Sequence, residues 1–406
     1  MSWPLGAENI GKGRLNVLHV LASINPAGGG PVEAARLYSS ARTDYDAEIL
    51  TLDSDPSPWT RAWTVPVHSV GHSRIYSRYS AGAVEWLGAN AGRFDAVVVH
   101  GVWGYHLVAV WRALRNTATP YFVILHGMLN PWFKRTYPLK HLKKTLAWRT
   151  VVGRTLRDSA GVLYLCPEER RLALSNFPIE SPAEAFAGLG TPASFAAPDL
   201  FFERFPELRS RRILLFLGRI CHMKGCDLLL RAFAGLSGND SDAQLVMCGP
   251  DDENLRRKLE RLSAALALKG RVTWTGPLYG PEKYSALSAA DLLVLPSRCE
   301  TFPVSVIEAL GCGTPVLVTR DVNIHPQIES CGAGLVCRSE VKSIRDAIRS
   351  WFKKDTAARD LARQRARECH AAHFSLETAI REHTAALRAN LAGKETEKTW
   401  QTSLSC

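Results

Sequence analysis

Short apolar runs alternate with longer segments of helical period along almost the whole chain of 406 residues. Such a run is typical of a strand buried on both faces, because the helices that join parallel strands cover the sheet on either side. The alternation therefore restricts the chain to α/β folds with parallel sheets. Strands are predicted at residues 17–21, 48–52, 65–70, 96–100, 121–125 and 161–165, and again at residues 213–217, 244–247, 272–274, 292–295, 316–318 and 334–336.

The chain is longer than one hydrophobic core usually organises, so two domains are expected. Prolines interrupt any long helix between residues 175 and 206, and we place the boundary there. The predicted domains are residues 1–195 and 196–372, both Rossmann-like. Helical patterns followed by a loose polar tail are expected over residues 373–406.

Composition and charge limit the partners. The formal net charge of +11 favours an anionic partner, which nucleic acid, a membrane surface or a phosphorylated small molecule would each satisfy. The basic residues are dispersed without a recognisable nucleic-acid-binding module, so nucleic acid is not expected. No apolar run approaches the roughly 20 residues that span a bilayer, and the segment from Met1 to Gly13 lacks the apolar centre of a secretory signal. We therefore expect a cytoplasmic protein, with its ten cysteines reduced and used for packing.

Three consecutive glycines follow the first predicted strand, where ligands bind in open parallel sheets. Gly28, Gly29 and Gly30 let the backbone approach a ligand, and the helix that follows offers N–H groups to an anion. The spacing differs from the dinucleotide fingerprint G-x-G-x-x-G, and no acidic residue clearly closes the next strand, so a nicotinamide cofactor is disfavoured. A flexible turn is the alternative interpretation.

Two neighbouring predicted strands end in histidine. His126 follows the strand at residues 121–125, and His100 ends the strand before it. An imidazole at a strand end can bind a substrate hydroxyl or take part in acid–base chemistry. A structural role is the alternative for both residues, and His126 is the stronger candidate.

A pair of cations follows the first strand of the second half. Arg219 lies at the strand end, and Lys224 opens the next helix. Two such cations suit a diphosphate, because a guanidinium and an ammonium both give charge-assisted hydrogen bonds to phosphate oxygens. Solvated surface charge is the alternative for either residue alone.

Two glutamates eight positions apart flank a predicted helix start after the strand at residues 292–295. Glu300 lies where a sugar could reach it, and Glu308 can accept hydrogen bonds from two adjacent ribose hydroxyls. The backbone N–H groups of Thr301, Phe302 and Val304, between the two glutamates, are candidates for binding the diphosphate or the sugar. Pro303 has no N–H group, but it fixes the turn among these residues. In the alternative, Glu300 merely favours the helix dipole and Glu308 is solvated. That alternative is weaker for Glu308, because its neighbours in the sequence are apolar.

These motifs resemble those of the retaining glycosyltransferases of family 4, and the resemblance extends over roughly residues 17–391. It implies the GT-B architecture, in which two Rossmann-like domains face each other and a C-terminal helix crosses back. It also implies that the protein is an enzyme that transfers a sugar from a UDP- or GDP-linked donor to a saccharide or lipid-linked saccharide. Retention of configuration is expected, with no metal ion and no cofactor.

The resemblance also implies a role for each candidate residue. Arg219 and Lys224 are similar to the basic pair that neutralises the donor diphosphate. Glu308 is similar to the ribose-binding glutamate, Glu300 to its partner near the transferred sugar, and His126 to the active-site histidine of the N-terminal domain. Donor contacts are further implied for the glycine loop at Gly28, Gly29 and Gly30 and for Leu278, which lies in the loop of the nucleobase pocket.

Two departures from the family pattern are present. Family members often have a small, glycine-containing run where this chain has Thr301, Phe302 and Pro303, and Gly188-Leu189-Gly190 replaces the usual Asn-Gly turn between the domains. Two other functions remain open: a GT-B nucleotide-sugar epimerase, and a catalytically silent nucleotide-sugar-binding module. The helix motif fits the epimerase less well, and the presence of both glutamates and both cations disfavours the silent module.

A basic amphipathic segment runs from Pro131 to Arg157. Eight basic residues are interleaved there with aromatic and aliphatic side chains, a pattern typical of a helix at an anionic lipid surface. We therefore predict a peripheral protein at the inner face of the cytoplasmic membrane, which extends a polyprenyl-diphosphate-linked saccharide in surface polysaccharide biosynthesis. An ordinary surface helix packed on the sheet is the alternative.

Overall fold

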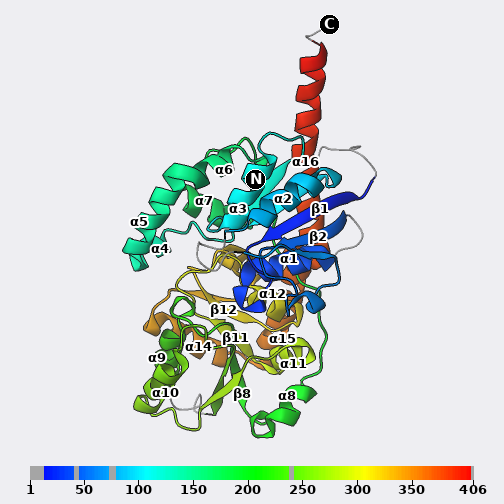
Figure 1. Cartoon of the computed structure of the whole chain (residues 1–406). Helices are drawn as coiled ribbons and strands as arrows, with labels where there is room; N and C mark the ends of the chain where they lie inside the picture. Colours follow the sequence, from blue (N-terminus) through cyan, green and yellow to red (C-terminus); the bar gives the residue numbers. More distant parts are fainter. Residues whose placement is uncertain (1–12, 41–44, 73–78, 237–241, 404–406) are drawn as a thin grey trace. The chain divides into compact units, whose positions relative to one another are not determined.

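The computed structural model describes residues 13–40, 45–72, 79–236 and 242–403, with side chains as far as Leu391. The chain divides into two compact units (Figure 1). Unit 1 contains Met1–Leu189 and Ala379–Cys406, and unit 2 contains Gly190–Thr378. The boundary predicted at residue 195 lies close to the observed division.

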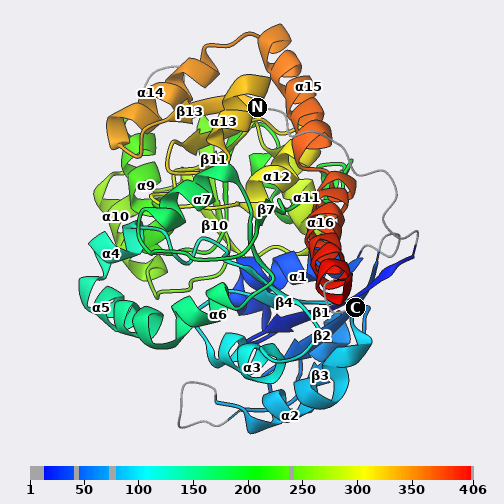
Figure 2. The same ribbon diagram turned by 90° about the horizontal axis from the view of Figure 1, so that it is seen from above.

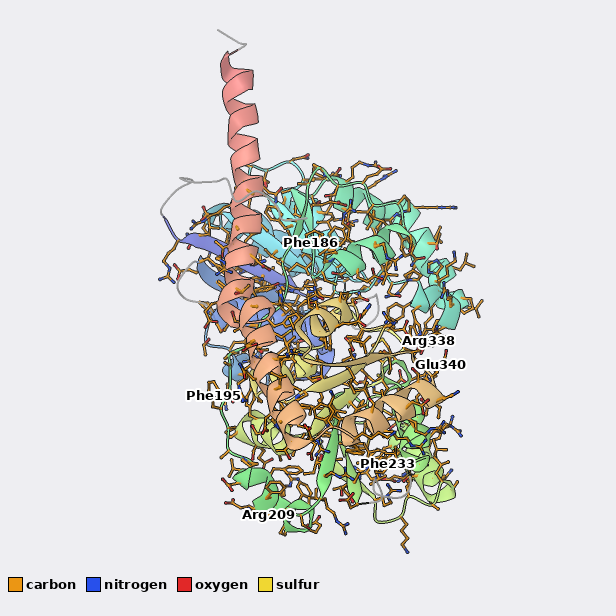
Figure 3. All side chains as sticks on the ribbon, turned by 180° about the vertical axis from the view of Figure 1, so that it is seen from behind. Phe186, Phe195, Arg209, Phe233, Arg338 and Glu340 are labelled. Carbon is orange, nitrogen blue, oxygen red and sulfur yellow. The ribbon has the colours of Figure 1, made fainter. Side chains whose placement is uncertain are left out.

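Unit 1 is built on a seven-stranded sheet in which every pair of neighbouring strands is parallel. The strand order is β3-β2-β1-β4-β5-β6-β7. The strands are β1 (Leu15–Leu21), β2 (Tyr45–Thr51), β3 (Val67–Ser69), β4 (Ala96–His100), β5 (Tyr121–Ile124), β6 (Gly161–Tyr164) and β7 (Glu184–Phe186). The sequence did not predict β7, a short edge strand whose Phe186 is 46% exposed and is labelled in Figure 3.

Helices cover the sheet of unit 1, so the apolar runs of β4, β5 and β6 are fully buried. The helices are α1 (Gly30–Ser40), α2 (Ala81–Asn90), α3 (Tyr105–Leu114), α4 (Trp132–Thr136), α5 (Pro138–Ala147), α6 (Gly153–Arg157), α7 (Pro167–Leu174) and α16 (Leu376–Ser403). A short 3-10 helix, η1 (Pro26–Gly28), precedes α1. The core between α2, α3 and the sheet contains Leu87, Val97, Val99, Leu107 and Val110.

Unit 2 contains a six-stranded parallel sheet with the order β10-β9-β8-β11-β12-β13. Its strands are β8 (Arg212–Leu217), β9 (Ala243–Cys248), β10 (Val272–Gly276), β11 (Leu292–Leu295), β12 (Val316–Thr319) and β13 (Gly334–Cys337). Its helices are α8 (Asp199–Arg204), α9 (Cys226–Ala234), α10 (Arg256–Ala265), α11 (Gly280–Ala289), α12 (Val304–Gly311), α13 (His325–Cys331), α14 (Val341–Phe352) and α15 (Thr356–His373), with a 3-10 helix η6 (His222–Lys224) before α9. The prediction of an α/β fold with two parallel sheets is confirmed.

The C-terminal helix connects the two units. The chain passes from unit 2 into unit 1 within α16, whose first half runs beside β1 and β2 in Figures 1 and 2. The backbone of α16 continues to Ser403, and a loose tail after Leu391 stays a prediction. Lysine and glutamate are frequent in this segment and proline is absent from it, which favours a helix.

Two expectations from composition can be compared with the described residues. The nine described cysteines form no disulfide with one another and eight of them are buried, as expected for packing residues, while Cys406 lies outside the described part of the chain. Among the described helices, none combines the length and the apolar character that crossing a bilayer requires.

Candidate functional site

The strand order of each sheet reverses at one point, and in open α/β sheets such a point is where ligands bind. In unit 2 the reversal lies between β8 and β11, which are neighbours in the sheet. The loop after β8 carries Arg219 and Lys224, and the loop after β11 carries Glu300. The topology of the sheet thus brings together residues that lie about 80 positions apart in the sequence.

Lys224 and Glu300 form a direct ion pair. Both side chains are largely buried, with 11% and 13% exposure. Gly225, in the left-handed conformation with φ of 69°, holds the lysine loop against β11, because a Cβ there would lie 2.1 Å from the carbonyl oxygen of Pro296. A buried ion pair of this kind holds both charges in place, since neither group can be left unpaired at low cost.

The two loops are joined by a second ion pair. Arg298 donates two hydrogen bonds to the carboxylate of Asp227, at 2.9 and 2.8 Å, and a third to the carbonyl oxygen of His222 at 2.9 Å. Its backbone N–H donates to the carbonyl of Met223 at 2.8 Å. The segment around Lys224 is therefore fixed to the segment around Glu300 by backbone as well as side-chain contacts.

Glu300 is also held by its backbone. Its N–H donates to the carbonyl of Asp321 at 2.9 Å, and its own carbonyl accepts from the N–H of Asn323 at 2.9 Å. These bonds attach the loop after β11 to the loop after β12. The loops after β8, β11 and β12, three neighbouring strands of the sheet, thus together fix the position of the Glu300 carboxylate.

Glu308 points into the protein from α12 and is 4% exposed. Its Oε1 accepts a hydrogen bond from Nζ of Lys283 at 2.5 Å and lies 3.4 Å from the hydroxyl of Tyr284. An inward-pointing carboxylate without a partner is costly, and Lys283 of α11 is a partner that the sequence did not predict. The solvated alternative for Glu308 is wrong, because the side chain is buried.

Among the remaining candidate residues of unit 2, Arg219 is partly exposed, whereas Phe302 and Leu278 are buried. Arg219 is 37% exposed and bound to Asp252 at 2.7 Å, so its guanidinium can reach both solvent and a ligand. Phe302 packs edge-on against Phe374, with ring centroids 5.9 Å apart, and Leu278 is 5% exposed. The side chains of Phe302 and Leu278 therefore lie inside the protein and support the loops by packing. Pro303 precedes α12, and Val304 is its first residue.

In unit 1 the reversal of strand order lies between β1 and β4. The loop after β1 contains η1, and Gly29 has a φ of 69°, which only glycine adopts readily. Gly28 is the last residue of η1 and Gly30 the first residue of α1. The glycine loop is therefore the turn into α1.

His126 lies beyond the end of β5 in a left-handed conformation with φ of 53°. The following N–H, that of Gly127, donates to Oε1 of Glu169, while Oε2 of Glu169 accepts from the N–H of Leu165 at 2.6 Å. Burial raises the pKa of Glu169 to about 7, although both backbone bonds oppose that shift. Glu169 thus fixes the loop that carries His126, a role that the sequence argument missed because Glu169 shows only as one of several charges at a helix start.

The ring of His126 is hydrogen-bonded to His100, with Nε2 of His126 2.9 Å from Nδ1 of His100. The two histidines that the sequence singled out in unit 1 are therefore in direct contact. Lys224 and Glu300 are in direct contact in unit 2, with Glu308 on the helix that follows Glu300.

Two parallel sheets with polar residues at their switch points define a pair of Rossmann-like units. Residues 28–184 match the glycosyl transferase 4-like domain, and residues 200–368 match glycosyl transferases group 1. D-inositol 3-phosphate glycosyltransferase from Mycobacterium tuberculosis is 34% identical over 169 residues, which are 41% of this chain and 35% of that protein. The match thus spans about a third of the length of these curated relatives.

Solved structures give the same fold. Sucrose-phosphate synthase from Thermosynechococcus elongatus aligns with a TM-score of 0.75 at 18% identity, covering 94% of this chain and all of that one. HepE from Anabaena, solved with UDP and glucose, aligns with a TM-score of 0.75 at 16% identity, covering 92% of this chain and 99% of that one. These alignments show that the chain has the GT-B fold.

Proposed function

We propose that the protein transfers a sugar, with retention of configuration and without a metal ion, from a UDP- or GDP-linked donor to a saccharide or polyprenyl-diphosphate-linked saccharide. The observation that carries this proposal is the buried pair of Lys224 and Glu300 at the β8/β11 switch point, with Glu308 on the adjoining helix. The HepE structures support a nucleotide sugar as donor, because they contain UDP, UDP and glucose, or UDP-glucose.

The charges of unit 2 suit the departure of a nucleoside diphosphate. As the bond between the anomeric carbon and the phosphate oxygen breaks, negative charge grows on the diphosphate, and Lys224 and Arg219 neutralise it. The donor phosphate takes the place of Glu300 at the ammonium of Lys224, which leaves the Glu300 carboxylate to bind hydroxyls of the sugar. Glu308 exchanges Lys283 for the ribose hydroxyls.

The acceptor attacks from the face that the diphosphate leaves, so configuration is retained. The new bond joins the acceptor oxygen to the anomeric carbon, and the departing phosphate oxygen takes the acceptor proton. No strong protein base is needed for this step, and His126 positions a hydroxyl of the sugar or of the acceptor.

Incubation with UDP- and GDP-linked sugars tests the proposal against its alternatives. With an extract of lipid-linked saccharides as acceptor, we expect UDP or GDP to be released while the sugar appears in the lipid fraction with its anomeric configuration unchanged. An epimerase would instead convert the donor to its epimer without lasting transfer. Binding of the donor with neither product would identify a silent module and contradict the proposal.

We further propose that the protein works at an anionic membrane surface through helix α5, which lies at the periphery of unit 1 in Figures 1 and 2. Leu139, Leu142 and Leu146 follow one face of this helix and are 79%, 69% and 66% exposed. They are among the most exposed large apolar side chains of the described residues. A helix packed in the ordinary way would bury these leucines.

The opposite side of α5 packs against aromatic rings through Lys144. Nζ of Lys144 lies 4.8 Å from the ring centre of Trp103 and 5.1 Å from that of Phe133. Burial, with a smaller contribution from Lys140, lowers the pKa of Lys144. The helix thus directs leucines outward and a lysine inward, an orientation that favours contact between the leucines and acyl chains while Lys140 and Lys143 contact headgroups.

Liposome co-sedimentation tests this membrane proposal. We expect binding to liposomes with anionic lipid, weakening as salt rises, and little binding to neutral liposomes. The double change Lys140→Glu and Lys143→Glu should weaken binding by about thirtyfold or more, since each basic residue near the surface contributes about 1 kcal/mol. Lys144 is left unchanged because its side chain is partly buried, whereas Lys140 and Lys143 are exposed.

The leucines provide the sharper comparison. The triple change Leu139→Ser, Leu142→Ser and Leu146→Ser should abolish sedimentation, whereas Leu361→Ser, which alters a leucine of unit 2 that is 46% exposed, should not affect it. Equal sedimentation of the triple variant and the wild type would contradict the assignment of α5.

A further inference from the structure

Three histidines lie on a diagonal across neighbouring strands of unit 1. His19 on β1 is level with Val98 on β4, and His100 is two residues further along β4. His100 in turn is level with Ile124 on β5, and His126 is two residues beyond that. Side chains two residues apart on one strand point to the same face of a sheet, so His19 and His100 lie on one face. The hydrogen bond between His126 and His100 brings the third imidazole beside them.

The three rings form one continuous line of hydrogen bonds. Nε2 of His126 is 2.9 Å from Nδ1 of His100, and Nε2 of His100 is 2.9 Å from Nδ1 of His19. The two end atoms, Nδ1 of His126 and Nε2 of His19, are buried and have no hydrogen-bond partner among the described residues. His19 and His100 are 0% and 3% exposed, whereas His126 is part-exposed.

The three imidazoles are neutral at neutral pH. Burial, and secondarily His383, lowers the pKa of His19 well below its usual range, and burial followed by His126 and His19 does the same for His100. Burial also lowers the pKa of His126 to about 3. A neutral imidazole has one N–H and one bare nitrogen, so each must donate through one ring nitrogen and accept through the other.

Counting protons leaves two arrangements. Each of the two hydrogen bonds needs one proton, and the three neutral rings carry three, so one end atom of the line is protonated. If that atom is Nδ1 of His126, all three rings carry their proton on Nδ1. If it is Nε2 of His19, all three rings carry it on Nε2.

We propose that His100 and His19 are positioning residues that set, through this shared line of protons, which nitrogen of His126 is protonated. The line makes Nδ1 of His126 either a donor or an acceptor without changing its charge. In one arrangement it donates to a hydroxyl oxygen, and in the other it accepts a hydroxyl proton. The assignment of that hydroxyl to the sugar or the acceptor rests on the proposed function, whereas the coupling of the three tautomers does not.

Nitrogen NMR of the whole protein labelled with ¹⁵N-histidine tests the coupling directly. Protonated and bare ring nitrogens differ in chemical shift, so the tautomer of each histidine can be measured without substrate. We expect His19, His100 and His126 to show the same tautomer, or the same ratio of the two. Different tautomers at His100 and His126, or a charged imidazolium in the line at neutral pH, would overturn the proposal even if the protein transfers sugar.

Variants extend the test. His19→Leu should alter the tautomer ratio of His126 although two hydrogen bonds separate the residues, while His383→Phe should leave it unchanged. The His383 ring stacks on Tyr38 with centroids 4.1 Å apart and forms no hydrogen bond among the described residues, so phenylalanine preserves its packing. An unchanged His126 ratio in a folded His19→Leu protein would contradict the coupling.

Turnover supplies a second readout. His100→Leu should lower kcat by about tenfold to a hundredfold, as loss of an orienting partner typically does. His100→Asn should recover part of this loss, because the amide can still bond to Nε2 of His126. Equal turnover of the leucine variant and the wild type would show that His126 does not need its partner.

Discussion

Lys224→Ala is expected to lower kcat/KM for the donor by about a hundredfold to a thousandfold, the usual cost of removing one electrostatic contact to developing negative charge. The loss also leaves the buried carboxylate of Glu300 without its partner, close to where the diphosphate is proposed to bind. Arg219→Ala should reduce kcat/KM less, since that guanidinium is 37% exposed and shared with Asp252. Steady-state kinetics with varied donor measure both effects.

A matched control for Lys224→Ala is Lys353→Ala, which removes an exposed cation beyond the end of α14. This control should retain wild-type kinetics, and the circular dichroism of all three variants should match that of the wild type. Near-normal kcat/KM in Lys224→Ala would remove the diphosphate role assigned to the ion pair.

The two glutamates are expected to affect different kinetic constants. Glu308→Gln should raise the donor KM by about tenfold to a hundredfold with little change in kcat, because hydrogen bonds to ribose are equally strong in the ground and transition states. Glu300→Gln should instead lower kcat, because its carboxylate is proposed to contact the sugar whose bond is broken. Initial rates over a range of donor concentrations separate the two effects.

The control for this pair is Glu282→Gln on α11, whose side chain is 49% exposed and bound to Arg204. It should change neither constant. Unchanged kinetics in both Glu308→Gln and Glu300→Gln would show that the two carboxylates do not contact the donor.

The sequence predicted the sheets well because parallel strands covered on both faces appear as continuous apolar runs. The strand β7 has no such run: it is three residues long, and only Ala185 of the three is not exposed. His19 was missed because it lies inside an apolar run and is surrounded by valine and leucine. Its relation to His100 depends on strand register, which the sequence alone does not provide.

The candidate site of unit 2 was predicted in its residue types but not in its pairing. Strand-end positions drew attention to Lys224 and Glu300, yet nothing in the sequence shows that they form an ion pair. Lys283 was missed because it lies within a helix and not directly after a strand, and its contact with Glu308 arises from the packing of two helices. In α5 the sequence showed an amphipathic pattern, but only the structure shows that its leucines face outward.

Calorimetric titration of the wild-type protein with UDP and with GDP tests the central claim most directly, because it requires neither the acceptor nor the identity of the sugar. We predict saturable binding of one of the two nucleotides at one site per chain, greatly weakened in Lys224→Ala and retained in Lys353→Ala. Absence of binding of both nucleotides at millimolar concentration, or equal binding by Lys224→Ala and the wild type, would contradict the assignment of the nucleoside diphosphate site.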